Sequence, residues 1–221
     1  MVLIDTVYQR VLAIANKEQR GYITPQEFNL FANQAQLEIL DSYILDIDRA
    51  SMTRGNETEY SDMSNFLNEK LGVFKTSVDL GASNVHVLPV DLYQLGSIFT
   101  GDNREVDQLT DSEFSKIMNS QFTIPNNIRP AAVIQNNSIT IAPPLAIRLT
   151  YIRRPLSVSW GYVVVNKKAL YDPNVTKTQN FELHASEETE LVYKILKLSG
   201  IAMQRQEIAQ FAQGMEQAIK Q

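Results

Sequence analysis

The chain contains no cysteine and only two histidines, His86 and His184, among its 221 residues. Without cysteine it can form no disulfide bond, no thiolate-bound metal site and no cysteine nucleophile. Two histidines are too few for a three-histidine metal site within one chain, and neither is part of a known catalytic motif. We therefore expect both histidines to be ordinary polar residues.

Motifs for common chemistry are missing as well. The sequence has no Gly-rich phosphate loop, no Gly-x-Ser-x-Gly and no His-Glu-x-x-His. Asp46-x-Asp48 lacks the glycine and the distal glutamate of a calcium loop. No stretch approaches the ~18 consecutive apolar residues of a membrane span. We expect a protein that is not an enzyme, with no catalytic residues, cofactor, metal or membrane contact.

Charge is low overall but unevenly distributed. The formal net charge is −5, which gives no global attraction to nucleic acid. Residues 1–120 hold 18 acidic and 9 basic side chains, whereas residues 121–221 hold 7 acidic and 11 basic ones. Two interpretations remain open: chance clustering on solvated faces, or complementary patches through which copies of the chain dock on one another.

The first third of the sequence predicts helices. An apolar stripe indicates one helix over 5–16, ending before Gly21. A second helix should begin at Thr24, because Thr24 and Glu27 form a capping box around Pro25, and it should continue to about residue 48. A polar loop is expected at 49–60, followed by a short helix over 61–71.

The middle of the chain alternates polar and apolar residues as strands do. A turn is expected at 81–84, and Asn136-Asn137 is a plausible hairpin turn. Thr110 and Glu113 form another capping box before a short helix. Ser186 should cap a C-terminal helix that continues to the end of the chain. The expected strands are 73–80, 85–88, 93–99, 131–135, 138–142, 146–152, 162–165 and 181–184.

This order of elements predicts an α+β fold with segregated helices and strands. The N- and C-terminal helices, residues 1–71 and 184–221, should form a helical bundle. Residues 72–183 should form an antiparallel β domain inserted into it.

Two charged groups are candidate sites, a basic one within residues 153–168 and an acidic one within residues 102–107. The basic group could contact phosphates or glycans on a β surface, or an acidic neighbouring subunit. The acidic group, with Asp111 and Glu113, could supply paired carboxylates of a hydrolase, although helix capping already explains those two. We interpret both groups as parts of oligomer or partner interfaces. The residues concerned are Arg153, Arg154, Lys167, Lys168, Asp102, Glu105 and Asp107.

Several stretches resemble known proteins. The segments Val11–Ile39 and Phe181–Gly200 are similar to the terminal parts of virion structural proteins from crAss-like and related short-tailed phages. The pieces Leu88-Pro-Val-Asp91, Ile139-Thr-Ile-Ala-Pro143 and Leu149-Thr-Tyr-Ile-Arg-Arg-Pro155 are similar to the β region of head–tail adaptor, or tail tubular, proteins. The resemblance covers most of the chain, with a variable middle.

The resemblance implies a ring protein of the phage neck or tail. About twelve copies would surround the channel below the portal protein, through which DNA passes without sequence-specific binding. The expected partners are copies of the chain, the portal and neighbouring tail or ring proteins. The protein would be made in the host cytoplasm and act in the virion. No catalytic residue is carried over.

Overall fold

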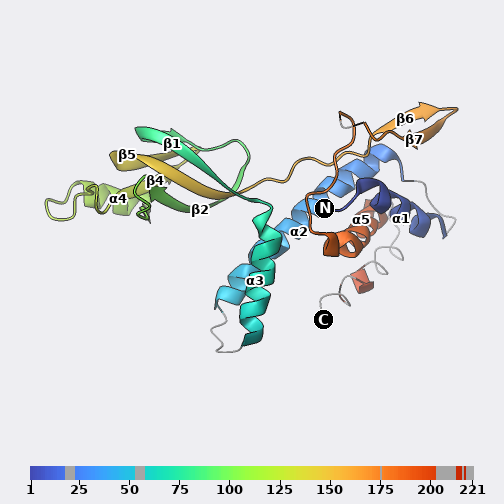
Figure 1. Ribbon diagram of the computed structural model, residues 1–221, viewed down its shortest axis with the longest axis horizontal. Coiled ribbons are helices and arrows are strands. Elements are labelled where there is room, and N and C mark those ends of the chain that lie inside the picture. Colours follow the sequence, from blue (N-terminus) through green and yellow to red (C-terminus); the bar gives the residue numbers. More distant parts are fainter. Residues whose placement is uncertain (18–22, 53–57, 175, 203–212, 216, 218–221) are drawn as a thin grey trace. The chain divides into compact units, whose positions relative to one another are not determined.

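The computed structural model describes residues 1–17, 23–52, 58–174, 176–202, 213–215 and 217 (Figure 1). The helices are α1 (Ile4–Lys17), α2 (Pro25–Met52), α3 (Thr58–Gly72), α4 (Asp111–Met118), the 3₁₀ helix η1 (Ala185–Glu187) and α5 (Glu188–Ala202). The strands are β1 (Lys75–Val87), β2 (Leu92–Thr100), β3 (Asp107–Leu109), β4 (Ala131–Gln135), β5 (Ser138–Arg153), β6 (Tyr162–Val165) and β7 (Lys168–Tyr171). The expected α+β class is confirmed.

The chain divides into two compact units. The first combines Met1–Val73 with Pro155–Gln221, and the second is Phe74–Arg154. In the first unit, α2 packs against α3 and α5, and α1 packs against α5. The second unit therefore ends well before residue 183, the end of the expected insertion. Residues 155–183 belong to the first unit instead, because α2 and the N-terminal segment form hydrogen bonds with them.

A polar ladder on α2, made of Asn29, Asn33 and Gln36, holds this extended segment. Asn33 accepts from the backbone N–H of Val158 at 2.8 Å and donates to its carbonyl at 2.8 Å. Asn29 accepts from the Trp160 N–H at 2.7 Å, and Gln36 donates to a carbonyl at residue 156 at 3.0 Å. The spacing of four and three residues places the ladder on one helical face, where it satisfies backbone groups that lack a sheet partner.

Trp160, the single tryptophan, is buried where this segment meets α1 and α2. Its indole N–H donates to Asp5 at 2.9 Å, and its ring lies 4.2 Å from that of Tyr8 between centroids. Tyr162 and Tyr171 stack against it at 5.9 and 5.8 Å. The base of the β6–β7 hairpin is thereby fixed to the helical core.

The capping boxes at the starts of α2 and α4 are confirmed. Thr24 N–H donates to Glu27 at 2.9 Å, and Thr110 and Glu113 exchange the equivalent bonds. The C-terminal cap is a correction: His184 caps η1 and accepts from the Ser186 N–H at 3.3 Å. Ser186 itself lies inside η1, and its hydroxyl is directed to Glu187.

Two helix boundaries also need correction. α2 continues to Met52 and α3 begins at Thr58, so the expected loop at 49–60 is wrong on both sides of residues 53–57. Arg49 in the last turn of α2 suits the negative end of the helix dipole. The expected stop at Gly21 and the continuation of the last helix over 203–212 lie outside the described residues.

The sheet of the second unit is built around β5. The strand order is β1-β5-β4-β3, and β2 pairs with the C-terminal half of β5. Strands expected at 138–142 and 146–152 form this one long strand, and the expected turn at 81–84 lies within β1. β1 remains paired there through shifts in register between Leu80, Ser83 and Val85. The hairpin turn at Asn136 is confirmed, with φ of 52°.

Strand alternation places the core of this unit on one side of the sheet. His86 is buried, whereas its neighbours Val85 and Val87 are exposed. No strand was expected for β3 or β7, and the strand expected at 181–184 is wrong, because of these residues only Phe181 pairs, in an isolated bridge to Val2. The core consists of Leu88, Ile98, Val106, Ala132, Ile139, Ile141, Ile147, Leu149 and Tyr151.

Candidate functional site

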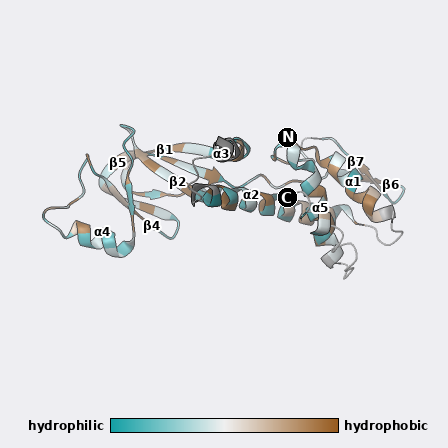
Figure 2. Cartoon of the chain, turned by 90° about the horizontal axis from the view of Figure 1, so that it is seen from below, coloured by the Kyte–Doolittle hydropathy of each residue, from teal (hydrophilic) through white to brown (hydrophobic). Residues whose placement is uncertain are grey.

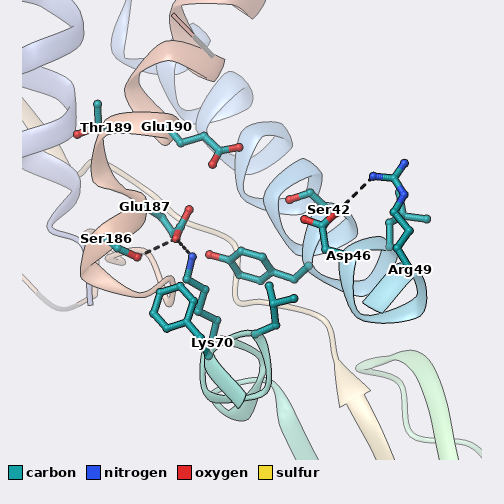
Figure 3. Close-up of a pocket in the computed structure, with 12 residues that line it drawn as sticks. Ser42, Asp46, Arg49, Lys70, Ser186, Glu187, Thr189 and Glu190 are labelled. Atoms are coloured by element: carbon teal, nitrogen blue, oxygen red, sulfur yellow. Dashed lines mark hydrogen bonds and ion pairs between the residues drawn. The ribbon is translucent and has the colours of Figure 1, made fainter. Parts of the chain in front are cut away.

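A groove in the first unit has a volume of about 970 Å³ (Figure 3). Side chains of α2, α3, η1 and α5 line it. Two neighbouring helices from the first third of the sequence and two elements from its C-terminal part thus meet around a shared set of polar groups. The labelled side chains in Figure 3 are Ser42, Asp46, Arg49, Lys70, Ser186, Glu187, Thr189 and Glu190.

A buried ion pair between Lys70 and Glu187 is the central feature of the groove. The two side chains are 13% and 6% exposed. The ammonium of Lys70 donates to Glu187 Oε1, which also accepts from the Ser186 hydroxyl at 2.8 Å. Lys70 Nζ also lies 4.4 Å from the centre of the Phe66 ring and 5.3 Å from that of Tyr43. The pair joins α3 to the start of α5 and rests on two aromatic rings.

This arrangement sets the protonation states of two groups. Burial opposes ionisation of Glu187, but the hydrogen bonds from Lys70 and Ser186 outweigh burial and lower the pKa of the carboxyl group. Burial raises the pKa of the Tyr43 hydroxyl, and the negative charges of Glu187 and Glu190 raise it further. The Tyr43 oxygen is close enough to act on Glu187, although its geometry falls short of a hydrogen bond. At neutral pH the groove therefore holds an ionised pair beside a neutral phenol.

The other charges along the groove also have partners. Asp46 lies 3.4 Å from Arg49, and Glu190 lies 3.7 Å from Lys194. Among the described residues, no group of three potential metal ligands comes together here or elsewhere. The groove therefore acts as an electrostatic brace between α2, α3 and α5, and its residues were not among those predicted from the sequence.

The predicted basic group is divided between two sheets. Arg153 is the last residue of β5 in the second unit, with its guanidinium 5.9 Å from the centre of the Phe74 ring. Arg154 follows it, and its N–H donates to the Asp91 carbonyl at 2.6 Å. Lys167 and Lys168 belong to the β6–β7 hairpin of the first unit. The arginine pair and the lysine pair therefore belong to different units, each with its own sheet.

The β6–β7 hairpin is a short ribbon with a basic tip. Its strands pair from Tyr162 opposite Tyr171 to Val165 opposite Lys168. The two turn residues, Asn166 and Lys167, have φ values of 49° and 64°, as a type I′ turn requires. Within the described part of the chain, the lysine side chains at this tip form no ion pair or hydrogen bond. In Figure 1 the tip of the hairpin points away from the helices.

The predicted acidic residues are exposed and separately engaged. Asp102 lies in the turn after β2, and Glu105 accepts from the Ser97 hydroxyl at 2.9 Å. Asp107 lies 3.9 Å from Arg129. Asp111 accepts from a glutamine side chain, and Glu113 belongs to its capping box. The structure does not gather these carboxylates into one pocket, as a paired-carboxylate mechanism would require.

Comparison with protein-family models finds no match, and comparison with curated proteins finds no similar sequence. None of the described helices combines the length and the apolar content needed to cross a membrane.

Proposed function

We propose that this chain is a structural subunit of a bacteriophage particle, a head–tail connector ring protein that assembles around the DNA exit channel below the portal. About twelve copies would close the ring, as the resemblance to adaptor proteins implies. The partners are copies of the chain, the portal protein and adjacent tail or ring proteins.

The observation that carries this proposal is the exposure of large apolar side chains in both units. Phe122, in the loop after α4, is 98% exposed, and Val164, in β6, is 63% exposed. Val90, Ile124 and Ile128 are exposed as well. Exposed apolar side chains of this size in several places are typical of a protein that buries them against partners.

The arrangement of elements supports the same function. Helices from both ends of the sequence share the first unit, and Phe74–Arg154 forms a separate β-rich unit between them. We infer that the helices form a bundle and that the β unit contacts neighbouring rings. This agrees with the adaptor architecture that the resemblance implies.

The uneven distribution of acidic and basic residues along the chain favours assembly into a ring. In a closed ring each subunit presents two different surfaces to its neighbours, so an acidic patch can meet a basic one around the circle. The predominance of acids before residue 120 and of bases after it provides such patches. Negative charge overall is also compatible with a channel through which DNA passes without being held.

A nucleic-acid- or glycan-binding β module is the alternative proposal. Against it, the four candidate cations are divided between two units, with Arg153 and Arg154 at the end of β5 and Lys167 and Lys168 in the β6–β7 hairpin. Fluorescence anisotropy with duplex DNA distinguishes the two. The ring proposal expects no tight salt-sensitive binding by the isolated chain, whereas strong binding at low salt that disappears as salt rises would favour the alternative.

Immunogold electron microscopy tests the proposed location. Antibodies raised against the purified chain should label the neck of particles whose tails have been loosened to expose it. An antibody against the major capsid protein serves as the control, labelling the shell. Labelling over the whole shell, or chain absent from purified particles by immunoblot, would contradict the proposal.

A further inference from the structure

We propose that the β6–β7 hairpin of one copy docks onto the exposed face of α2 in the next copy. This inference rests on the proposed function, because it takes a second copy of the chain as the partner. It adds the surface through which neighbouring copies would recognise each other.

The two faces of the hairpin differ. Cross-strand partners share a face, and successive residues alternate between faces. One face therefore carries Tyr162 and Tyr171, which stack on Trp160 at the base of the hairpin. The other, called the outer face, carries Val163, Val165, Lys168 and Leu170, and all four are exposed. The outer face thus combines three apolar side chains with a cation, beside Lys167 in the turn.

The hairpin itself contains no acid, and Asp172, which follows it, is paired with Lys177 at 3.0 Å. Between residues 156 and 171 there are two lysines and no aspartate or glutamate. An isolated two-stranded ribbon is at best marginally stable in water, and its edges and apolar faces favour association. The chemistry of the hairpin therefore calls for a partner surface that is apolar and acidic.

α2 provides such a surface on its solvent side. Helical periodicity places Leu30, Gln34, Leu37, Asp41, Leu45 and Asp48 along one line, called the acidic stripe. Leu30 is 71% exposed and Leu45 is 54% exposed, and the two aspartates are exposed too. Figure 2 shows hydrophilic and hydrophobic segments alternating along α2. The helix carries five acidic side chains and one basic one.

The two surfaces match in size as well as in chemistry. Each hairpin strand has four residues, a length of about 13 Å. The part of the acidic stripe from Leu37 to Asp48 spans about 17 Å along the helix axis. Leucines of the stripe would cover the outer face, and the aspartates would meet the lysines of the tip. Pairing between two hairpins would leave those lysines without acids, so it suits the charges less well.

The interface is head-to-tail, since hairpin and stripe are different surfaces of the same unit. Such contacts repeat from copy to copy and close into a ring when the rotation allows it. The hairpin face is mostly apolar, which makes a phosphate backbone a poor partner for it.

Charge reversal in purified full-length protein tests this pairing, with assembly followed by analytical ultracentrifugation. K167E/K168E and D41K/D48K should each weaken self-association, or association on the portal, by about tenfold or more, and the two combined in one chain should restore it. K116E and E69K reverse exposed charges elsewhere and should leave assembly unchanged. Val163→Gln on the outer face should weaken assembly, whereas Val85→Gln, at a valine of β1 that is also exposed, should not.

The outcomes separate this inference from the proposed function. If the wild-type chain assembles and the reversals have no effect, or the combined variant is not restored, the docking pair is overturned while the ring proposal stands. A wild-type chain that stays monomeric with and without portal overturns both. Loss of DNA binding in K167E/K168E with unchanged assembly would instead assign the hairpin to phosphate. Far-UV circular dichroism and Trp160 fluorescence confirm that each variant is folded.

Discussion

Replacing Lys70 with methionine should destabilise the first unit strongly at neutral pH. Methionine keeps most of the apolar volume of the lysine side chain but removes the cation that neutralises Glu187. The carboxylate then remains in a site where it is 6% exposed, with the Ser186 hydroxyl as its remaining hydrogen-bond donor in the groove. A buried charge that loses its partner is far more costly than the loss of a surface ion pair.

The expected size follows from the geometry of the groove. Removing one partner of a buried ion pair costs about 3–5 kcal/mol, and we take the lower end because the groove admits water on one side. For a urea m-value of about 2 kcal/mol/M, a loss of about 3 kcal/mol lowers the unfolding midpoint by about 1.5 M. Trp160 is the natural reporter, since it is buried in the same unit.

The pH dependence gives the sharper test. In the wild type the pKa of Glu187 is lowered below its ordinary 4.5, so the stability from its ionised form is present above that value and is lost as pH falls through the folded-state pKa. Without Lys70, burial should raise the pKa of Glu187. As pH falls, protonation then removes the unpaired buried charge and reduces the destabilisation of the variant. The difference in unfolding free energy between wild type and Lys70→Met should therefore shrink from pH 7 to pH 4.

Urea titrations followed by Trp160 fluorescence at both pH values measure this difference. Asp46→Asn is the matched control, because it breaks the ion pair with Arg49, whose side chains are 41% and 76% exposed. An exposed pair is worth about 0–1 kcal/mol. An equal loss in the two variants, or a Lys70→Met effect independent of pH, would refute the assignment of a buried ionic brace.

Three further changes test the first unit, each read by Trp160 fluorescence in urea. Thr24→Ala removes the helix cap and should cost about 1 kcal/mol, whereas Thr24→Ser should keep most of it; equal losses would contradict the capping role. Asn33→Ala leaves two backbone groups of the extended segment without their partner and should cost about 2–4 kcal/mol, whereas Gln34→Ala on the exposed side should be near neutral. Gly161→Ala places a methyl group 2.5 Å from a threonine hydroxyl and 2.8 Å from a carbonyl, and should cost about 1–3 kcal/mol, whereas Gly72→Ala meets nothing within 4 Å; a silent Gly161→Ala would show that the hairpin base is not packed as described.

Features that depend on nearby residues could be predicted from the sequence. The start of α2 follows from Thr24, Pro25 and Glu27, which lie within one helical turn. β4 has the bounds 131–135 that its apolar run indicated. In both cases the physical cause is local, so one short stretch of sequence contains all of it.

Features that depend on distant partners could not be predicted. Lys70 and Glu187 are 117 positions apart, and nothing in either neighbourhood marks the pair. The three amide side chains of the ladder on α2 have no distinctive sequence context. Their role depends on residues 156–160, which lie against them in the structure. Without that information, the boundary of the β insertion was placed at the last strand-like residue rather than at Arg154.

The β6–β7 hairpin could be predicted only in part. The run Tyr162–Val165 predicted β6, but the Asn166-Lys167 turn lacks the usual glycine, and β7 was therefore not expected. A left-handed conformation at a lysine is uncommon and is maintained by pairing on both sides. The two basic pairs were grouped because they are close in sequence, although the chain passes from one unit to the other between them.

Mass photometry of the purified chain, alone and mixed with the portal protein of the same phage, tests the central claim most directly. We expect either a closed oligomer of the chain alone or a monomer that joins the portal as a discrete ring, with a mass corresponding to about twelve added copies. A stable monomer whose mass distribution is unchanged by the portal would contradict it.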